Sequence, residues 1–293
     1  MIRRIVALGV LLASLIGTLT FVGPSQSVSA PLVFGRMHKI FQPNKGKIFI
    51  LVIGNDARSG NPNSARADAI HIVGVNTKTM KAGVLNFPRD SWVHIPGRGT
   101  TKMNEALQVG GPETLGRTLE SLTGIHIDYW VMTGFQGFMG IIDGLGGIKV
   151  HLRTGVYDPK GSGAHLKAGT QVLGPKSSLA YVRTRYAFGS GDLARTTNQG
   201  RYLIQMLRKL RKQVKTNPAS LLNWISLTKR FARFDLSGDE LFRLGVLASQ
   251  IHPGDVKNVT VPARTGSAGA ASVVFISGSA RSIYRRFRRH ASL

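Results

Sequence analysis

The sequence predicts a mixed α/β (α+β) fold, in which a central, partly antiparallel sheet is covered by helices on both faces. Short β-branched runs alternate with amphipathic stretches, and two of these runs lie close enough to pair as a hairpin. Hydrophobic residues make up 42% of 293 residues, enough for a packed core. A long uncharged run near the start predicts one N-terminal transmembrane helix. The expected division is a cytoplasmic tip (1–4), a transmembrane anchor (5–23), a linker (24–46), an extracytoplasmic folded domain (47–262) and a basic C-terminal tail (263–293).

The apolar run from Ile5 to Gly23 is about as long as the roughly 20 residues that cross a bilayer as a helix. Arg3 and Arg4 precede it, and positive charge is retained on the cytoplasmic side, so everything after the run would lie outside. A cleaved signal peptide is the alternative, because Val28-Ser29-Ala30 resembles a processing site. The length of the run, and Pro31 directly after that site, favour a retained anchor. Either interpretation predicts an exported domain.

Extended segments are expected in the first hundred residues. Lys47–Asn55 is a continuous apolar run rich in β-branched residues, typical of a buried strand. Ala69–Asn76 and Lys81–Phe87 are joined by a short Asn-Thr-Lys-Thr turn, which favours an antiparallel hairpin. Pro88 then breaks the strand, and Trp92–Ile95 resumes extended structure.

Helices and strands alternate in the rest of the chain. Glu113–Leu122 is expected to be a helix, because Gly111-Pro112 opens it and Gly124 closes it. From Leu193 to Val214 apolar residues recur at helical spacing, which predicts a long amphipathic helix. The other expected elements are strands at Asp128–Thr133, Ile148–Leu152 and Lys257–Pro262 (the last rejoining the sheet), helices at Phe135–Leu145, Leu221–Phe231 and Asp239–Gln250, and a glycine-rich loop at Asp158–Gly169.

Charge and composition limit the possible functions. The chain carries 39 Lys+Arg against 14 Asp+Glu, a formal charge of +25, which predicts an anionic partner such as nucleic acid, an acidic membrane or a phosphate-bearing polymer. Export argues against nucleic acid. The basic run Arg285–Arg289 is interpreted as a solvated tail touching lipid phosphates or polymer. The absence of cysteine excludes disulfides, thiolate zinc sites, iron–sulfur clusters and a cysteine nucleophile. Neither a G-x-S-x-G elbow nor a P-loop is present.

Three carboxylates between residues 56 and 90 each have an arginine nearby. The pairs are Asp56 with Arg58, Asp68 with Arg66, and Asp90 with Arg89. All lie at the ends of predicted strands or in the connecting loops, where sites are commonly built. Carboxylates favour a hard cation and guanidinium groups favour phosphate, so together they indicate a phosphate–magnesium site suited to a pyrophosphate. The alternative is three surface ion pairs in a basic protein.

A second group of polar residues follows about 90 residues later. Arg183 and Arg185 are two apart, so in an extended backbone both side chains would leave the same face. Arg195 and Gln199 are four apart and share one face of a helix expected to begin near Asp192, whose positive dipole end would add to the site. If this group folds against the first, arginines surround the carboxylates.

At these residues the sequence resembles the LytR–CpsA–Psr family of cell-wall ligases, over a stretch from about Phe49 to Leu210. The motifs that carry the resemblance, in order, are Leu51–Arg58, Arg66–Ile70, Phe87–Ser91, Lys102–Ala106, Gly110–Glu113, Ile127–Tyr129, Leu145–Gly147, Ala180–Arg185, and Arg195 followed by Gln199. Asn55, Ala69 and Asn198 depart from the family's usual residues, and none of these changes removes a proposed metal ligand.

The resemblance implies a phosphotransferase anchored in the bacterial cell membrane by a single span, with its catalytic domain outside. Such enzymes take a glycopolymer from a polyprenyl-pyrophosphate lipid and attach it to peptidoglycan through a phosphodiester, with a muramic acid hydroxyl as nucleophile. By this resemblance Asp56 and Asp68 would coordinate Mg²⁺ (or Mn²⁺). The implied pyrophosphate-binding residues are Arg58, Arg66, Arg89, Arg183, Arg185, Arg195 and Gln199, and the implied catalytic residues are Arg89, Asp90, Arg183 and Arg185.

Two other functions remain open from the sequence. A pyrophosphatase acting on the same polyprenyl-linked substrates would need nearly the same site, with water in place of the sugar hydroxyl. A non-catalytic protein could bind anionic wall polymer through its charge alone, and its binding would fall steeply with salt. The sequence does not distinguish teichoic acid, capsule or an arabinogalactan-like glycan as the polymer.

Overall fold

The computed structural model describes residues 46–56, 65–185, 187 and 191–293. The expected anchor at 5–23 and the linker, apart from Gly46, lie outside these residues, as does Arg58. Within the described part of the chain, no helix combines the length and apolar character that a membrane crossing requires.

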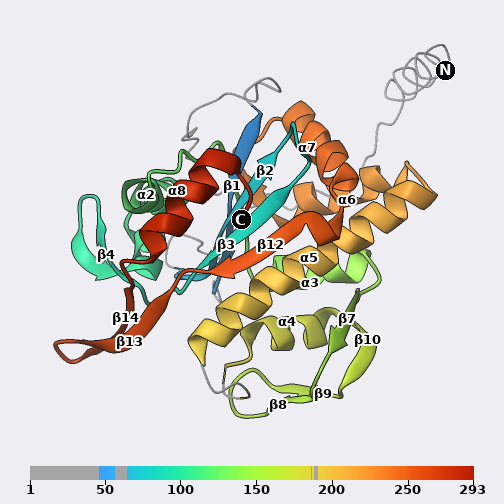
Figure 1. Ribbon diagram of the computed structural model, residues 1–293. Helices are drawn as coiled ribbons and strands as arrows, with labels where there is room; N and C mark the ends of the chain where they lie inside the picture. Colours follow the sequence, from blue (N-terminus) through green and yellow to red (C-terminus); the bar gives the residue numbers. More distant parts are fainter. Residues whose placement is uncertain (1–45, 57–64, 186, 188–190) are drawn as a thin grey trace, which may run out of the picture. The chain divides into compact units, whose positions relative to one another are not determined.

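A six-stranded mixed sheet forms the centre of the fold, with the strand order β11-β6-β1-β2-β3-β12 (Figure 1). β1 pairs antiparallel with β2 and β2 with β3, which confirms the expected hairpin, while β6 runs parallel to β1 and β12 parallel to β3. β12 thus rejoins the sheet as expected. The strands are β1 (Lys47–Asn55), β2 (Ala67–Asn76), β3 (Ala82–Phe87), β6 (Tyr129–Thr133), β11 (Arg233–Phe234) and β12 (Val256–Thr260).

One face of this sheet is covered by α2 (Ala106–Thr123) and α8 (Ala280–His290), as Figure 1 shows. Phe287 of α8 meets Phe49 of β1 edge to face, with ring centroids 5.4 Å apart. The ring of Phe287 lies so close to β2 that a Cβ at Gly74 would come within 2.7 Å of it. A glycine at this position therefore lets α8 pack directly on the sheet.

The opposite face is covered by α5 (Asp192–Thr216) and α7 (Gly238–Gln250), with α6 (Ser220–Phe231) beside them (Figure 1). Leu203 and Leu207 of α5 pack on Val84 of β3. α7 begins with a capping box, in which Ser237 accepts a hydrogen bond from the backbone of Glu240 and the Glu240 carboxylate accepts one from Ser237. Helices on both faces confirm the predicted layers.

A second apolar cluster packs against α5 outside the main sheet. It is built from α3 (Phe135–Gly144), β7 (Ile148–Leu152), β8 (Val156–Asp158), β9 (Ala164–Leu166), β10 (Gly169–Leu173) and α4 (Pro175–Arg183). Ile142 and Tyr202 are among its buried members. The region 158–169 was expected to be a loop, but β8 and β9 form a short hairpin there.

The C-terminal region is not the tail that the sequence predicted. Residues 263–293 form a hairpin of β13 (Ala263–Ala268) and β14 (Ala271–Ile276), followed by α8. Tyr284 and Phe287 are buried in the main core, because they alternate at helical spacing with the arginines that had suggested a solvated segment. The folded domain therefore continues past residue 262.

The remaining elements connect the sheet to its covering helices. α2 is longer than expected because it begins at Ala106, but non-helical angles at Gly110 and Gly111 separate its first turn from the part that Pro112 opens. Gly124 ends it in the left-handed conformation, as predicted. The short elements are β4 (Trp92–Ile95), β5 (Gly99–Lys102), η3 (Met103–Glu105) and η4 (Pro253–Asp255).

Candidate active site

Several of the residues singled out from the sequence meet at one end of the central sheet. β1 finishes just before Asp56, β2 begins just before Asp68, and β3 finishes just before Pro88 and Arg89. Because the three strands are antiparallel neighbours, these three points lie at the same sheet end. The hairpin topology is thus what gathers carboxylates and arginines from separate segments.

Arg89 is the centre of the first group. Its Nη1 donates a hydrogen bond to Oδ1 of Asp68, and its Nε lies 3.7 Å from Oδ2 of Asp90. Lys102 holds the other side of Asp90, with Nζ 3.4 Å from Oδ1. Burial alone would lower the pKa of Arg89, but the nearby carboxylates outweigh it and raise that pKa. Arg89 is therefore a fixed positive charge.

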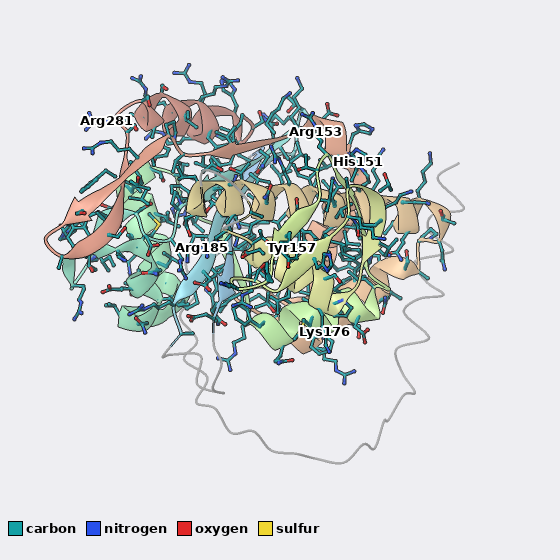
Figure 2. The ribbon with its side chains drawn as sticks, turned by 90° about the horizontal axis from the view of Figure 1, so that it is seen from below. His151, Arg153, Tyr157, Lys176, Arg185 and Arg281 are labelled. Atoms are coloured by element: carbon teal, nitrogen blue, oxygen red, sulfur yellow. The ribbon has the colours of Figure 1, made fainter. Side chains whose placement is uncertain are left out.

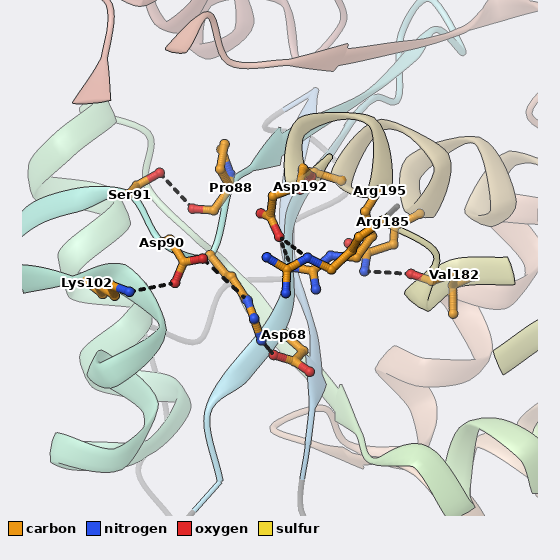
Figure 3. A network of polar contacts seen from close by, with 12 residues as sticks. Asp68, Pro88, Asp90, Ser91, Lys102, Val182, Arg185, Asp192 and Arg195 are labelled. Atoms are coloured by element: carbon orange, nitrogen blue, oxygen red, sulfur yellow. Dashed lines mark hydrogen bonds and ion pairs between the residues drawn. The ribbon is translucent and has the colours of Figure 1, made fainter. Parts of the chain in front are cut away.

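The second group stands at the start of α5. Arg195 is only 4% exposed, and its Nη2 lies 2.6 Å from Oδ1 of Asp192. Arg185 shares the same carboxylate oxygen, with Nε 3.4 Å away (Figure 3). Burial lowers the pKa of Arg195, and the Asp192 charge partly opposes that effect. Two guanidinium groups thus share the Asp192 carboxylate as their counter-ion.

The two groups form one site. Asp192 contributes to raising the pKa of Arg89, while Arg89 and Arg185 both help to lower that of Arg195. These mutual effects require the charges to lie near one another. The juxtaposition expected from the sequence, with arginines around carboxylates, is present for Asp68, Arg89, Arg185 and Arg195.

The approach to α5 differs from the sequence prediction. Residues 181–185 were interpreted as extended, but α4 continues as a helix to Arg183, and only Thr184 is extended. The Arg183 guanidinium consequently lies over the Phe135 ring, 4.7 Å from its centroid, while Arg185 reaches Asp192. The two arginines do not leave a common strand face.

Gln199 fixes α5 to the end of α4. Its Nε2 donates to the backbone oxygen of Val182 at 3.0 Å, and its buried Oε1 has no hydrogen-bond partner. Arg195 shares this face of α5, as its spacing of four predicted, and its Nε is also buried without a hydrogen-bond partner. Unused polar atoms in a buried position are costly unless a ligand engages them.

Asp56 and Arg66 close the loop between β1 and β2. The backbone N–H of Arg66 donates to Oδ1 of Asp56 at 2.7 Å, and the N–H of Asp56 donates to the oxygen of Arg66 at 3.2 Å. Arg66 is an exposed residue. Arg58, between them in the sequence, lies outside the described residues.

Asp56 and Asp68 are the residues present that could hold a divalent metal. Gly54 pairs with Ala69 but Asn55 pairs with Ala67, so Asp68 is the extra residue at this register shift and Asp56 follows directly after it. In residues 46–56, 65–185, 187 and 191–293, no group of three or more acidic or histidine side chains is placed to hold a metal. Mg²⁺ in proteins is often bound by one or two carboxylates together with water and substrate phosphates, so this donor set fits a metal that arrives with a phosphate.

Three residues of the site were not assigned a role from the sequence. Asp192 was noted only as a helix start, yet it is the counter-ion of two arginines; its spacing of three from Arg195 was the available signal. Lys102 braces Asp90, and Asn104 is 3% exposed with an unpaired side-chain oxygen. Both belong to a motif that the resemblance included, but nothing in their spacing indicated that Lys102 contacts Asp90 or that the backbone N–H of Asn104 donates to the backbone oxygen of Arg89.

A sheet end that gathers guanidinium groups around a few carboxylates defines a class of site able to bind a multiply charged phosphate together with a cation. A sequence model described as the LytR_cpsA_psr family matches residues 25–285 of the chain. The chain belongs to this family.

Individual relatives are similar over most of the described domain. The chain is 32% identical over 230 residues to the probable cell wall biosynthesis protein LcpB of Corynebacterium glutamicum. The matched region covers 72% of this chain and 53% of that protein. It is 36% identical over 180 residues to the polyisoprenyl-teichoic acid–peptidoglycan teichoic acid transferase TagT of Bacillus subtilis, covering 58% of the chain and 55% of that protein. The chain thus spans about half the length of these curated relatives.

Solved structures share the fold. A structure of TagT bound to LIIa-WTA superimposes with a TM-score of 0.71 at 25% identity, over 86% of this chain and 94% of that one. A structure of YwtF (TagT) with bound octaprenyl pyrophosphate lipid gives a TM-score of 0.66 at 23% identity, over 90% of this chain and 99% of that one, and shows likeness of fold. The mixed α/β architecture is therefore that of the family.

Proposed function

We propose that the protein is a phosphotransferase that moves a glycopolymer from a polyprenyl-pyrophosphate carrier onto peptidoglycan. The observation that carries this proposal is the meeting of Arg89, Arg185 and Arg195 with Asp68 and Asp192 at one sheet end. The activity in the name of TagT and the octaprenyl pyrophosphate in a structure of similar fold support it. We further propose that the run at 5–23 anchors the protein in the bacterial membrane, with the domain outside.

Guanidinium N–H groups of the site are buried without hydrogen-bond partners, as are both carboxylate oxygens of Asp192. Arg185 and Arg195 both approach a single oxygen of Asp192, and the Nε atoms of Arg89 and Arg195 are buried without hydrogen-bond partners. A pyrophosphate supplies several oxygens to such forks, and guanidinium groups bind phosphate bidentately. Arg66, Arg183, Gln199 and, outside the described residues, Arg58 complete the proposed binding set.

The proposed reaction transfers the phosphorylated polymer to a sugar hydroxyl. The hydroxyl oxygen of the acceptor attacks the phosphorus that carries the polymer, and the bond from that phosphorus to the bridging oxygen breaks. Polyprenyl phosphate leaves with the electron pair, and the hydroxyl proton passes to a base, for which Asp90 is our candidate. A Mg²⁺ (or Mn²⁺) ion held by Asp56 and Asp68 would neutralise phosphate charge.

The protein's own contribution is positioning and fixed charge. Arg89 is held by Asp68 and Asp90, so its guanidinium needs no rearrangement as charge develops on the phosphate oxygens. Lys102 contacts the other oxygen of the Asp90 carboxylate, so that side chain is held between Lys102 and Arg89. Phosphoryl transfer depends mainly on such placement.

The test follows release of polyprenyl phosphate by the full chain in detergent, from a short-chain polyprenyl-pyrophosphoryl sugar with Mg²⁺. Release is measured with and without a peptidoglycan fragment for wild type, Asp68→Ala, Arg89→Ala and, as a control, exposed Arg208→Ala. The proposal expects release that needs acceptor and metal and is lost in the first two variants only. Release without acceptor would instead establish a pyrophosphatase, and salt-sensitive polymer binding with no release in any sample would establish a binding protein.

A further inference from the structure

A groove lies between the end of α2 and the outer side of α8, away from the candidate active site. Its volume is about 660 Å³, and none of the active-site residues described above lines it. In Figure 2, Arg281 of the groove lies apart from Arg185 of the active site. Its lining comes from the end of α2, including Thr123 and Gly124, and from α8 and the turn before it, including Ser279 and Arg281.

Three arginines line one side of this groove, which we call the α8 groove. Arg281, Arg285 and Arg288 are four and three residues apart, so at about 100° per residue they form one stripe along α8. All three are exposed, and within the part of the chain that the structure describes none forms an ion pair with a carboxylate. Hydroxyls of Thr123, Ser279 and Ser282 add polar atoms to the same lining.

The packing of α8 on the sheet does not depend on these arginines, although the Arg288 guanidinium lies against Gly124 at the end of α2. α8 is held to the sheet by Phe287 and by Tyr284, whose buried side chain also lines the groove. Like charges four residues apart destabilise a helix, and Arg281, the second residue of α8, meets the positive end of the helix dipole. Arg288, in the last turn of α8, is favourably placed for the dipole, but three exposed like charges on one stripe still repel one another, which indicates an anionic ligand.

The position of the groove in the domain indicates which kind of anion it binds. Nζ of Lys47 donates to the backbone oxygen of Arg288 at 3.3 Å, so the end of α8 lies beside the start of β1. The preceding residues 1–45, which include the apolar run Ile5–Gly23, join the domain here. If that run lies in a membrane, its headgroups are within reach of α8. Arg286 and Arg289, also exposed, extend the positive surface around the helix.

We propose that the α8 groove binds the phosphate headgroups of an anionic lipid surface, which docks the domain on the membrane. The inference rests on the proposed membrane attachment but not on the transfer chemistry. Clusters of four or more basic side chains next to a membrane anchor attract anionic lipids, at roughly a fivefold change in equilibrium for each residue. The Ser279 hydroxyl in the groove can donate to phosphate, whereas those of Thr123 and Ser282 already donate to backbone oxygens.

Because the chain has no cysteine, one label can report on docking. A fluorophore is attached through Ser282→Cys in the groove, or through Val172→Cys on exposed β10 as a reference. The full chain is reconstituted in vesicles of phosphatidylcholine alone, or of phosphatidylcholine and phosphatidylglycerol in equal parts, each with a trace of headgroup-spin-labelled lipid. Quenching of the fluorophore measures its approach to the headgroups.

The proposal expects quenching at position 282, but not at 172, only in vesicles with phosphatidylglycerol. Combining Arg281→Gln, Arg285→Gln and Arg288→Gln should shift the docking equilibrium about a hundredfold toward the free state. The control combines Arg208→Gln, Lys212→Gln and Lys215→Gln on exposed parts of α5, makes the same change in charge, and should leave docking intact.

Equal quenching in both vesicles, or equal losses in the two triple variants, would overturn the proposal. A label that is quenched in neither kind of vesicle but responds to soluble polyphosphate would also overturn the proposal. The groove would then bind a soluble polymer. An unchanged thermal midpoint shows that the α8 variant is folded. Its release of polyprenyl phosphate in detergent should equal that of wild type, which separates failure of docking from failure of the proposed reaction.

Discussion

At the scale of single residues, Asp192 determines whether buried Arg195 is tolerated. We expect Asp192→Asn to lower the free energy of unfolding by about 3 kcal/mol, because removing one partner of a buried ion pair leaves an uncompensated charge. Denaturant titration measures the change. The control Asp239→Asn removes a carboxylate that is 67% exposed and paired with Arg243, and it should cost less than about 1 kcal/mol. Equal losses would contradict a special role for Asp192.

His71 predicts a pH dependence of stability. Burial lowers its pKa to about 4, while the hydrogen bond with Asn86 acts in the opposite direction. In the unfolded chain the pKa is about 6.5, so between these values the unfolded state binds the proton and the folded state does not. The stability that neutral His71 provides is present above about pH 6.5 and is lost as the pH falls toward 4.

The expected loss from this residue is about 3 kcal/mol between pH 7 and 4. The measurement compares the free energy of unfolding of wild type and His71→Gln across that range. The wild type should lose more stability than the variant by this amount. Parallel curves would show that His71 titrates normally in the folded state.

At the scale of elements, α5 is held to the sheet by a polar network that lies below the candidate site. His71 contacts Asn86, which donates to Asn258, and Asn258 donates to the backbone oxygen of Thr197 on α5. Gly200 lets the helix approach this network, because a Cβ there would collide with the side-chain oxygens of Asn86 and Asn258. The network thus determines how closely α5, the helix that carries Arg195, approaches the sheet.

Gly200→Ala should therefore lower pyrophosphate affinity about tenfold or more, although alanine is the better helix former by roughly 1 kcal/mol. The added methyl group pushes α5 away from the sheet and moves Arg195 and Gln199 with it. Calorimetric titration with magnesium pyrophosphate measures the affinity. Gly238→Ala on α7, where a Cβ would meet nothing within 4 Å, is the control and should bind as wild type does.

The same scale shows what the sequence could predict. Long periodic elements such as α5 were located to within a few residues, because burial on one face imposes a repeat that is visible in the sequence. The strands β8 and β9 have three residues each, too few to display any period. The segment at α8 was misinterpreted because its arginines dominate its composition, although its buried aromatic residues keep helical spacing.

At the scale of the whole molecule, the residues of the candidate site come together only because segments distant in the sequence meet. Asp68 and Arg89 could be brought together from the hairpin prediction alone, because its topology places a strand start beside a strand end. The contact between Asp192 and Arg185 could not, since it depends on how the end of α4 meets the start of α5, whereas the contact of Asp192 with Arg195 is local to α5. Spacing along the chain predicts which residues share one face of a helix or strand. It does not predict how far that face lies from another element.

A net charge of +25 raises the question whether anions bind at one site or over the whole surface. A ligand at a hundred times its dissociation constant stabilises the folded state by about 2.7 kcal/mol, which for a domain of this size raises Tm by roughly 5–10 °C. We expect magnesium pyrophosphate to do this for wild type and for the triple α8 variant. Arg89→Ala should abolish the shift although it removes only one charge, because it empties the centre of the site. Chelation of Mg²⁺ should reduce the shift in wild type. A shift that instead follows net charge, and so falls most in the triple α8 variant, would show that pyrophosphate binds by diffuse attraction to a basic surface and not between Arg89 and Arg195.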